Sequence, residues 1–294
     1  MDRFLFLTVN GLARGAVFAA FALALVLIWR GARLVNFAQG AMAVATAYLA
    51  YSVALHSGSY WLGFGVAIVG GLLLGAIVER GVMRFVGHHA PLNEVIVALG
   101  VVLVIQAALG MIYGNEYLPA FAPFSRTPLE IAKVSLLSPY DLWVFGSIIA
   151  VVVLLWLLFS HTRIGLRLRA SAFAPEVSRL LGVNVAGMRT LGWALAAAVG
   201  ALASMLIIPT ELGLHPNAMD LVFVSSFTAA VLGGLDSPTG AVIGGLAVGL
   251  ILSYVTGYLP DGSDLSQIAV LGLLLAVLLV RPGGLFARAT ARRV

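Results

Sequence analysis

The chain has 294 residues, of which 61% are hydrophobic and only 10% are charged, and its mean hydropathy is +1.06. Soluble domains have about 45–50% apolar and about 25% charged residues, so this composition excludes soluble, disordered and fibrous proteins and predicts a membrane protein. The formal net charge is +5, but the arginines stand between apolar runs, which indicates membrane topology and not nucleic-acid binding. Because cysteine is absent and the five histidines are scattered, we predict no disulfide and no metal site.

Apolar runs separated by short polar joints predict an all-α polytopic membrane protein with a helical bundle of eight to nine transmembrane spans. The first run follows Arg3 and resembles a signal peptide, but Arg14 interrupts it, so we interpret it as a retained span. The run at 220–235 is short and ends in two glycines, so it is either a full span or a re-entrant helix. The predicted spans are residues 11–29, 35–55, 60–78, 94–113, 141–160, 189–209, 220–235, 239–258 and 265–281.

The distribution of basic residues predicts an orientation with the N-terminus outside and the C-terminus in the cytoplasm. With nine alternating spans, this orientation places three cations outside, at Arg3, Arg126 and Lys133, and leaves Arg14 unassigned. The positive-inside rule favours it. The thirteen cations inside are Arg30, Arg33, Arg80, Arg84, the five arginines from 163 to 189, and the four arginines from 281 to 293.

We predict one transmembrane domain over residues 1–294, with two joints that are longer than turns. Residues 114–140 contain four prolines and are predicted to form a periplasmic loop. Residues 161–188 are predicted to form a cytoplasmic amphipathic loop, because arginines alternate with apolar residues at helical spacing. This segment is either an interfacial helix that only sets topology or a docking face for a partner.

Motifs for nucleotide binding and nucleophilic catalysis are missing from the sequence. The lysine needed for a GxxxxGK[ST] loop is absent, since the single lysine follows Glu-Ile-Ala, and no GxGxxG or GxSxG motif occurs. We therefore predict no catalytic residue and no bound cofactor, and any use of ATP requires another chain. Most acids stand near span ends, which weighs against an ion-coupled carrier, although Glu94 and Glu211 would lie deeper if the span bounds moved by a few residues.

A few polar side chains fall at span edges and are candidates for a solute pathway. Asn36 and Gln39 lie where the second span begins, and Asn93 and Glu94 open the fourth. A buried amide must be paired or face water, so Asn36 and Gln39 either line a pathway or cap helices and bond between them. Gln106, alone on an apolar helix, is predicted to make a packing bond.

Four sequence blocks stand out along the chain. They are Asn-Phe-Ala-Gln-Gly at 36–40, Thr-Arg-Ile-Gly-Leu-Arg-Leu-Arg-Ala at 162–170 leading into 176–185, Val-Leu-Gly-Gly-Leu-Asp-Ser-Pro-Thr-Gly-Ala at 231–241, and Val-Arg-Pro-Gly-Gly-Leu-Phe at 280–286. In this order they resemble the membrane permeases of branched-chain amino acid ABC importers, with the LivH-type member as the closer match. The likeness runs from about Gly11 to Phe286, nearly the whole chain.

The resemblance implies a subunit in the bacterial cytoplasmic (inner) membrane that forms half of a translocation pathway. It implies a sister permease of LivM type, two ATPase subunits of LivG and LivF type that carry ATP and Mg, and a periplasmic or lipid-anchored substrate-binding protein. Branched-chain amino acids, other amino acids, urea and short amides are the solutes implied. A stand-alone secondary carrier and a non-transporting scaffold remain as alternatives.

Two departures from the family pattern weaken the assignment of any one solute, such as leucine, isoleucine or valine. Ala41 stands where relatives often have an acid after the Asn-Phe-Ala-x-Gly block, and Asp236 stands where a glycine is usual in Gly-Gly-x-Gly-Ser. The first removes a charge near the implied pathway, and the second adds one at a predicted cytoplasmic turn.

Two cytoplasmic joints are candidates for the contact with the ATPases. The turn between residues 233 and 240 is expected to be the main contact, and the segment from 163 to 184 a supporting face; either can instead be a plain connection. The candidate residues are Arg163, Gly165, Arg169, Glu176, Arg179, Gly182 and Asn184 in the segment, and Gly233, Gly234, Asp236 and Ser237 in the turn.

Overall fold

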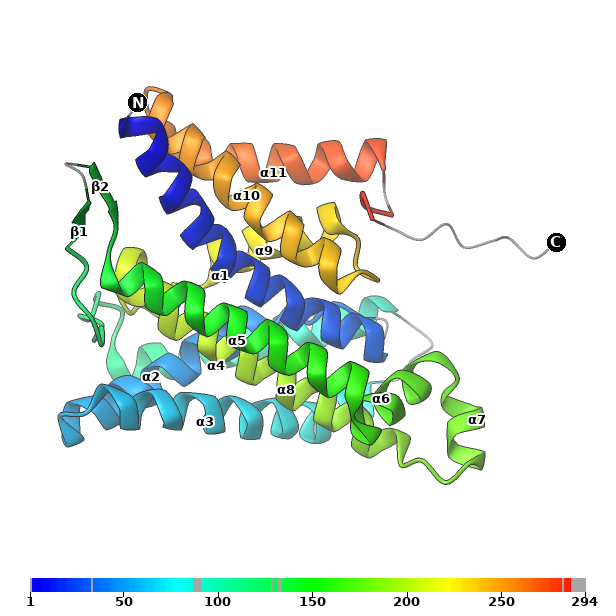
Figure 1. Ribbon diagram of the computed structural model, residues 1–294. Coiled ribbons are helices and arrows are strands. Elements are labelled where there is room, and N and C mark those ends of the chain that lie inside the picture. Colours follow the sequence, from blue (N-terminus) through cyan, green and yellow to red (C-terminus); the bar gives the residue numbers. More distant parts are fainter. Residues whose placement is uncertain are drawn as a thin grey trace.

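The computed structural model describes residues 2–32, 34–86, 91–127, 129–131, 134–281 and 283–286, and within them it is a helical bundle with one small β-sheet (Figure 1). A helix lies in each of the nine predicted apolar runs. These helices are α1 (Asp2–Ala32), α2 (Gln39–Ser57), α3 (Tyr60–Gly81), α4 (Pro91–Tyr113), α5 (Pro139–His161), α8 (Val185–Ile207), α9 (Asp220–Gly233), α10 (Pro238–Tyr258) and α11 (Gly262–Val280).

Six of the described helices are long and apolar enough to cross a membrane, which supports a multi-pass protein. They are α1, α3, α4, α5, α8 and α10, some with a short extension beyond the bounds above. The helix α9 and the stretch Leu265–Val280 of α11 are apolar but shorter.

The joints contain structure that the apolar pattern did not predict. An antiparallel pair, β1 (Leu129–Ile131) and β2 (Val134–Leu137), lies within the predicted loop 114–140, so the fold is not purely helical. Two short helices, α6 (Arg163–Phe173) and α7 (Pro175–Leu180), occupy the amphipathic segment. A 3₁₀ turn follows α3 as η1 (Met83–Phe85), and a π-helical turn follows α8 as η2 (Ile208–Leu212).

The first helix is longer than predicted, because it begins at Asp2 and continues through Arg14. The predicted start at residue 11 is therefore wrong.

The core of the bundle lies around α1 and α8, which are 83% and 78% buried over their most apolar stretches. Small residues let α10 approach α1 closely: a Cβ added at Gly249 would lie 2.3 Å from the Cα of Gly15. Such contacts hold membrane helices together where the surrounding lipid is as apolar as the side chains. In contrast, α4 is only 11% buried and lies at the periphery.

The two ends of the bundle carry different elements (Figure 1). The β1–β2 pair lies at one end, here called the hairpin end, together with the start of α1. The helices α6 and α7 lie at the other, here called the α6–α7 end, together with the end of α11 and the turn between α9 and α10.

Candidate functional site

Two predicted pathway residues, Asn36 and Gln39, are fully buried where α2 begins. Asn36 Nδ2 donates to Gln39 Oε1 at 2.9 Å, and Gln39 Nε2 donates to the carbonyl oxygen of Ala196 in α8 at 2.8 Å. A Cβ added at Gly200 would lie 2.4 Å from Gln39 Nε2, so the glycine gives the amide room to reach α8 in this position. These bonds join α2 to α8 and satisfy the amides within the chain.

The other two predicted pathway residues lie in the first turn of α4, where Asn93 is exposed and Glu94 is buried. Among the described residues, no hydrogen bond joins this pair to Asn36 and Gln39. The structure thus places the four residues as two pairs on different helices, and their role in a solute pathway stays a prediction.

Gln106 of α4 makes the packing bond that we predicted, and its partner is a charged residue of α9. Its Nε2 donates to both carboxylate oxygens of Asp220, at 3.0 Å and 3.3 Å. Asn217 Nδ2 donates to the same carboxylate at 3.1 Å. No sequence pattern indicates the partner, since 114 residues separate Gln106 from Asp220.

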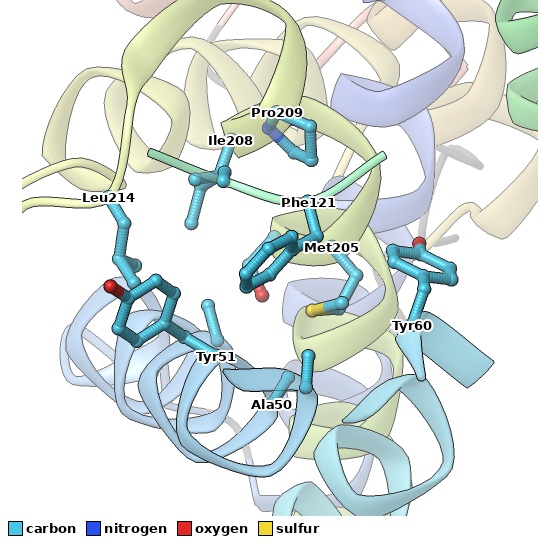
Figure 2. Close-up of a pocket in the computed structure, with 12 residues that line it drawn as sticks. Ala50, Tyr51, Tyr60, Phe121, Met205, Ile208, Pro209 and Leu214 are labelled. Carbon is cyan, nitrogen blue, oxygen red and sulfur yellow. The ribbon is translucent and has the colours of Figure 1, made fainter. Parts of the chain in front are cut away.

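A small apolar cavity lies between α2, α8 and the loops at the hairpin end. Figure 2 shows Tyr51, Tyr60 and Phe121 around it, with Met205 and Leu214 completing the wall. Its volume is about 30 Å³, which is room for about two water molecules. The cavity is therefore too small for an amino acid.

A larger cavity of about 300 Å³ lies between α1, α5 and the end of α8, with Arg14, Arg126 and Asp141 in its wall. Asp141 Oδ2 accepts hydrogen bonds from the backbone N and the Oγ of Ser138, both at 2.8 Å, which caps the start of α5. Arg126 donates to the carbonyl oxygen of Pro209. The charges of Arg126 and Asp141 therefore hold chain segments together at this cavity.

Exposed apolar side chains lie on α6 and α7, the segment that we predicted as a supporting face for the ATPases. Phe173 is 91% exposed, Leu180 is 88% exposed and Leu181 is 78% exposed. Contiguous apolar patches of this kind mark protein or membrane contacts. The predicted residues Arg163, Arg169, Glu176, Arg179, Gly182 and Asn184 are exposed in the same segment, while Gly165 is buried against α5.

Side-chain caps stabilise the helix starts on both sides of the α6–α7 segment, at α6 and at α8. Thr162 Oγ1 accepts from the backbone N of Gly165 at 3.0 Å, and Asn184 Oδ1 accepts from that of Gly187 at 2.9 Å. Each bond satisfies an orphan donor in the first turn of a helix. These two caps set where α6 begins and where α8 begins, on either side of the α6–α7 segment.

The turn between α9 and α10, which we predicted as the main ATPase contact, is more enclosed. Gly233 and Gly234 are buried, Ser237 caps α10 by accepting from Gly240 N at 3.0 Å, and Asp236 is exposed. The segment after α11 covers one side of the turn, since the backbone N of Leu285 donates to the carbonyl oxygen of Leu232 at 2.8 Å. The turn thus offers a smaller free surface than α6 and α7.

A buried carboxylate near the α6–α7 end links α3 to α8. Glu79 is fully buried, and its oxygens accept from Arg189 Nε at 2.7 Å, Thr190 Oγ1 at 2.5 Å and Arg84 Nη2 at 3.3 Å. Arg189 and Thr190 lie in the first two turns of α8. The sequence analysis treated Glu79 only as one more acid near a span end and missed this cluster.

A comparison with known proteins now identifies the family. A model described as "Branched-chain amino acid transport system / permease component" matches residues 7–278. The chain belongs to this permease family. The resemblance found in the sequence is thereby confirmed.

Relatives of this permease match over most of its length. The high-affinity branched-chain amino acid permease BraD of Pseudomonas aeruginosa is 27% identical over 97% of this chain and 96% of its own. A probable LivH permease of Methanocaldococcus jannaschii is 28% identical over 90% of this chain and 86% of its own. The ribose import permease RbsC of Escherichia coli is 27% identical over 69% of this chain and 59% of its own. These relatives are transport permeases and not enzymes.

Proposed function

We propose that this chain is the transmembrane permease subunit of an ATP-driven ABC importer and forms half of its translocation pathway. The observation that carries the proposal is the family match over residues 7–278. The absence of a GxxxxGK[ST] loop from the sequence fits a division of labour in which separate ATPase subunits bind ATP and Mg. The remaining partners are a sister permease of LivM type and a periplasmic or lipid-anchored binding protein.

The solutes that we propose are branched-chain amino acids or related small polar molecules. The BraD and LivH relatives, which match nearly end to end, support amino acids. The ribose relative, which matches a smaller share, supports a family in which one fold carries different small solutes.

We place the protein in the bacterial cytoplasmic membrane with the α6–α7 end in the cytoplasm. Arg84, Arg163, Arg167, Arg169 and Arg179 gather at or near that end, in accord with the positive-inside rule. The ATPases dock on this end. The exposed Phe173, Leu180 and Leu181 favour α6 and α7 as the larger contact, and the α9–α10 turn as the supporting one.

The experiment that tests the function is reconstitution of the permease with its genomic partners. The complex is purified through this chain, placed in proteoliposomes with MgATP on the ATPase side, and supplied with the binding protein and L-leucine. We expect a sister permease and two ATPases to copurify, and L-leucine uptake to require ATP hydrolysis.

The matched control is a complex whose ATPases carry a substitution of the phosphate-loop lysine, which binds nucleotide phosphates. Uptake by that complex, or by this chain alone, would replace the importer by a secondary carrier. ATP hydrolysis without uptake of any amino acid would refute the solute class.

A further inference from the structure

The carboxylate of Asp220, the first residue of α9, is exposed on the surface of the protomer. It is held by two amide donors, Gln106 of α4 and Asn217 of the preceding turn, at 3.0–3.3 Å. In the part of the chain that the structure describes, no arginine or lysine pairs with it. An exposed carboxylate is ordinary in water but costly in lipid. The depth of Asp220 in the membrane therefore determines whether its exposure needs an explanation.

The position of Gln106 along α4 gives a first estimate of that depth. The helix α4 has 23 residues, which at 1.5 Å per residue is about 34 Å, close to the thickness of a hydrocarbon core of about 30 Å. Gln106 lies seven residues before Tyr113, the last residue of α4. It is therefore about 10 Å below the hairpin end of the helix.

The length of α9 gives a second, independent estimate. The helix has 14 residues, about 21 Å, and it ends at the turn to α10, which lies at the α6–α7 end (Figure 1). Asp220 at its start is then about 9 Å short of the opposite surface of a 30 Å core. Both estimates place the carboxylate roughly 8–10 Å inside the hydrocarbon region.

A carboxylate at that depth does not face lipid, because intramembrane charges lie against protein or a water-filled space. Leu99 and Leu103 of α4 precede Gln106 by seven and three residues, which places all three on one side of the helix. Both leucines are exposed in the protomer. We call the surface formed by Leu99, Leu103, Gln106 and Asp220 the α4–α9 face.

We propose that the α4–α9 face lines the aqueous translocation path and that Asp220 binds the protonated amine of a passing solute, as an α-amino acid carries. The inference rests on the proposed import function and names the group that the path recognises. Gln106 and Asn217 are positioning residues, because their amides fix the carboxylate while they leave it open on the exposed side. A charge-assisted hydrogen bond between carboxylate and ammonium is among the stronger polar contacts in a site of low dielectric.

Cysteine labelling in the reconstituted complex tests whether the face meets water. The chain has no cysteine, so Leu103→Cys provides a single thiol, and Val104→Cys is the matched control. Both positions are exposed in the protomer, at 68% and 69%, but Val104 lies two residues before Gln106, on about the opposite side of α4.

The labelling probe is the membrane-impermeant cation (2-trimethylammonioethyl) methanethiosulfonate, with mass spectrometry of this chain as the readout. We expect Leu103→Cys to be modified at least tenfold faster than Val104→Cys. Protection of Leu103→Cys, or equal rates at both positions, overturns the assignment of the path to this face.

The role of the charge is tested by Asp220→Asn in the Leu103→Cys background. The rate of the cationic reagent divided by that of its anionic sulfonatoethyl analogue is expected to fall at least fivefold, because the carboxylate concentrates cations near the thiol. L-leucine uptake by Asp220→Asn is expected to fall about tenfold, with ATP hydrolysis and copurification of the partners kept. Asp261→Asn, an exposed acid at the start of α11, is the matched control and should transport normally.

Failure of the inference and failure of the proposed function give different results. Uptake by the unsubstituted complex that does not depend on ATP hydrolysis refutes the function. Normal uptake in that complex with an unchanged reagent ratio in Asp220→Asn refutes only the ammonium site. A loss of the sister permease from Asp220→Asn preparations also refutes it, because the carboxylate then serves as an ion-pair partner between subunits.

Discussion

Replacement of the buried Glu79 by glutamine should destabilise the permease by several kilocalories per mole. The substitution keeps the size of the side chain but removes the charge that faces Arg189 at 2.7 Å and Arg84 at 3.3 Å. The side chain of Arg189 is 18% exposed and that of Arg84 is 38% exposed. Arg189 therefore keeps a poorly hydrated charge without its partner, whereas Arg84 can turn to water.

The magnitude follows from these two exposures. Removal of one partner from a buried ion pair costs about 3–5 kcal/mol, and the more exposed pair with Arg84 adds under about 1 kcal/mol. Since Thr190 Oγ1 can still donate to the amide oxygen, we take the lower half of the range, about 3–4 kcal/mol. At roughly 2 °C per kcal/mol for a chain of this size, Tm should fall by about 6–8 °C.

The assay is thermal unfolding of the chain in detergent, followed by the fluorescence of its five tryptophans. Arg80→Gln is the matched control, because Arg80 is adjacent in sequence and exposed, and surface substitutions stay within about 0.5 kcal/mol. An equal Tm for Glu79→Gln and Arg80→Gln would refute the reasoning, since it would mean that the cluster contributes nothing beyond an exposed ion pair.

Three further substitutions test the packing and the partner face. Gln39→Ala removes the bond from α2 to α8 and should lower stability by about 1–3 kcal/mol, which thermal unfolding in detergent would show. Gly249→Ala places a Cβ 2.3 Å from the Cα of Gly15 and should cost about 1–3 kcal/mol in Tm measurements, whereas Gly272→Ala, with nothing within 4 Å, should leave Tm unchanged. Leu180→Glu, at a side chain 88% exposed, should keep Tm but reduce copurification of the ATPases at least tenfold; full recovery of the ATPases would place their contact elsewhere.

The sequence was sufficient to predict the helices but not the ends of all of them. Runs of apolar residues report which segments enter a membrane, and each predicted run contains a helix. The first helix begins at Asp2, nine residues before the predicted span, because a helix can extend beyond the apolar stretch that marks a span. The β1–β2 pair was missed because its strands have three and four residues, too few for alternation to show.

The candidate site was predicted less well, because its contacts join residues far apart in sequence. Asn36 and Gln39 stand three residues apart, so their pairing is visible as a motif. Glu79 and Arg189 are 110 residues apart, and no periodicity connects them. The packing bond of Gln106 was predicted, but its partner Asp220 was not, because that residue lies on another helix.

The polar groups of the bundle fall into two kinds once burial and depth are considered together. Asn36, Gln39 and Glu79 are fully buried, and their partners belong to this chain, so the fold alone accounts for them. Asp220 differs, because its carboxylate is exposed although the lengths of α4 and α9 place it inside the membrane. A single protomer in lipid would bear the full cost of that charge. Contact with water in the translocation path removes that cost, which is why we expect the α4–α9 face to be open to the solute.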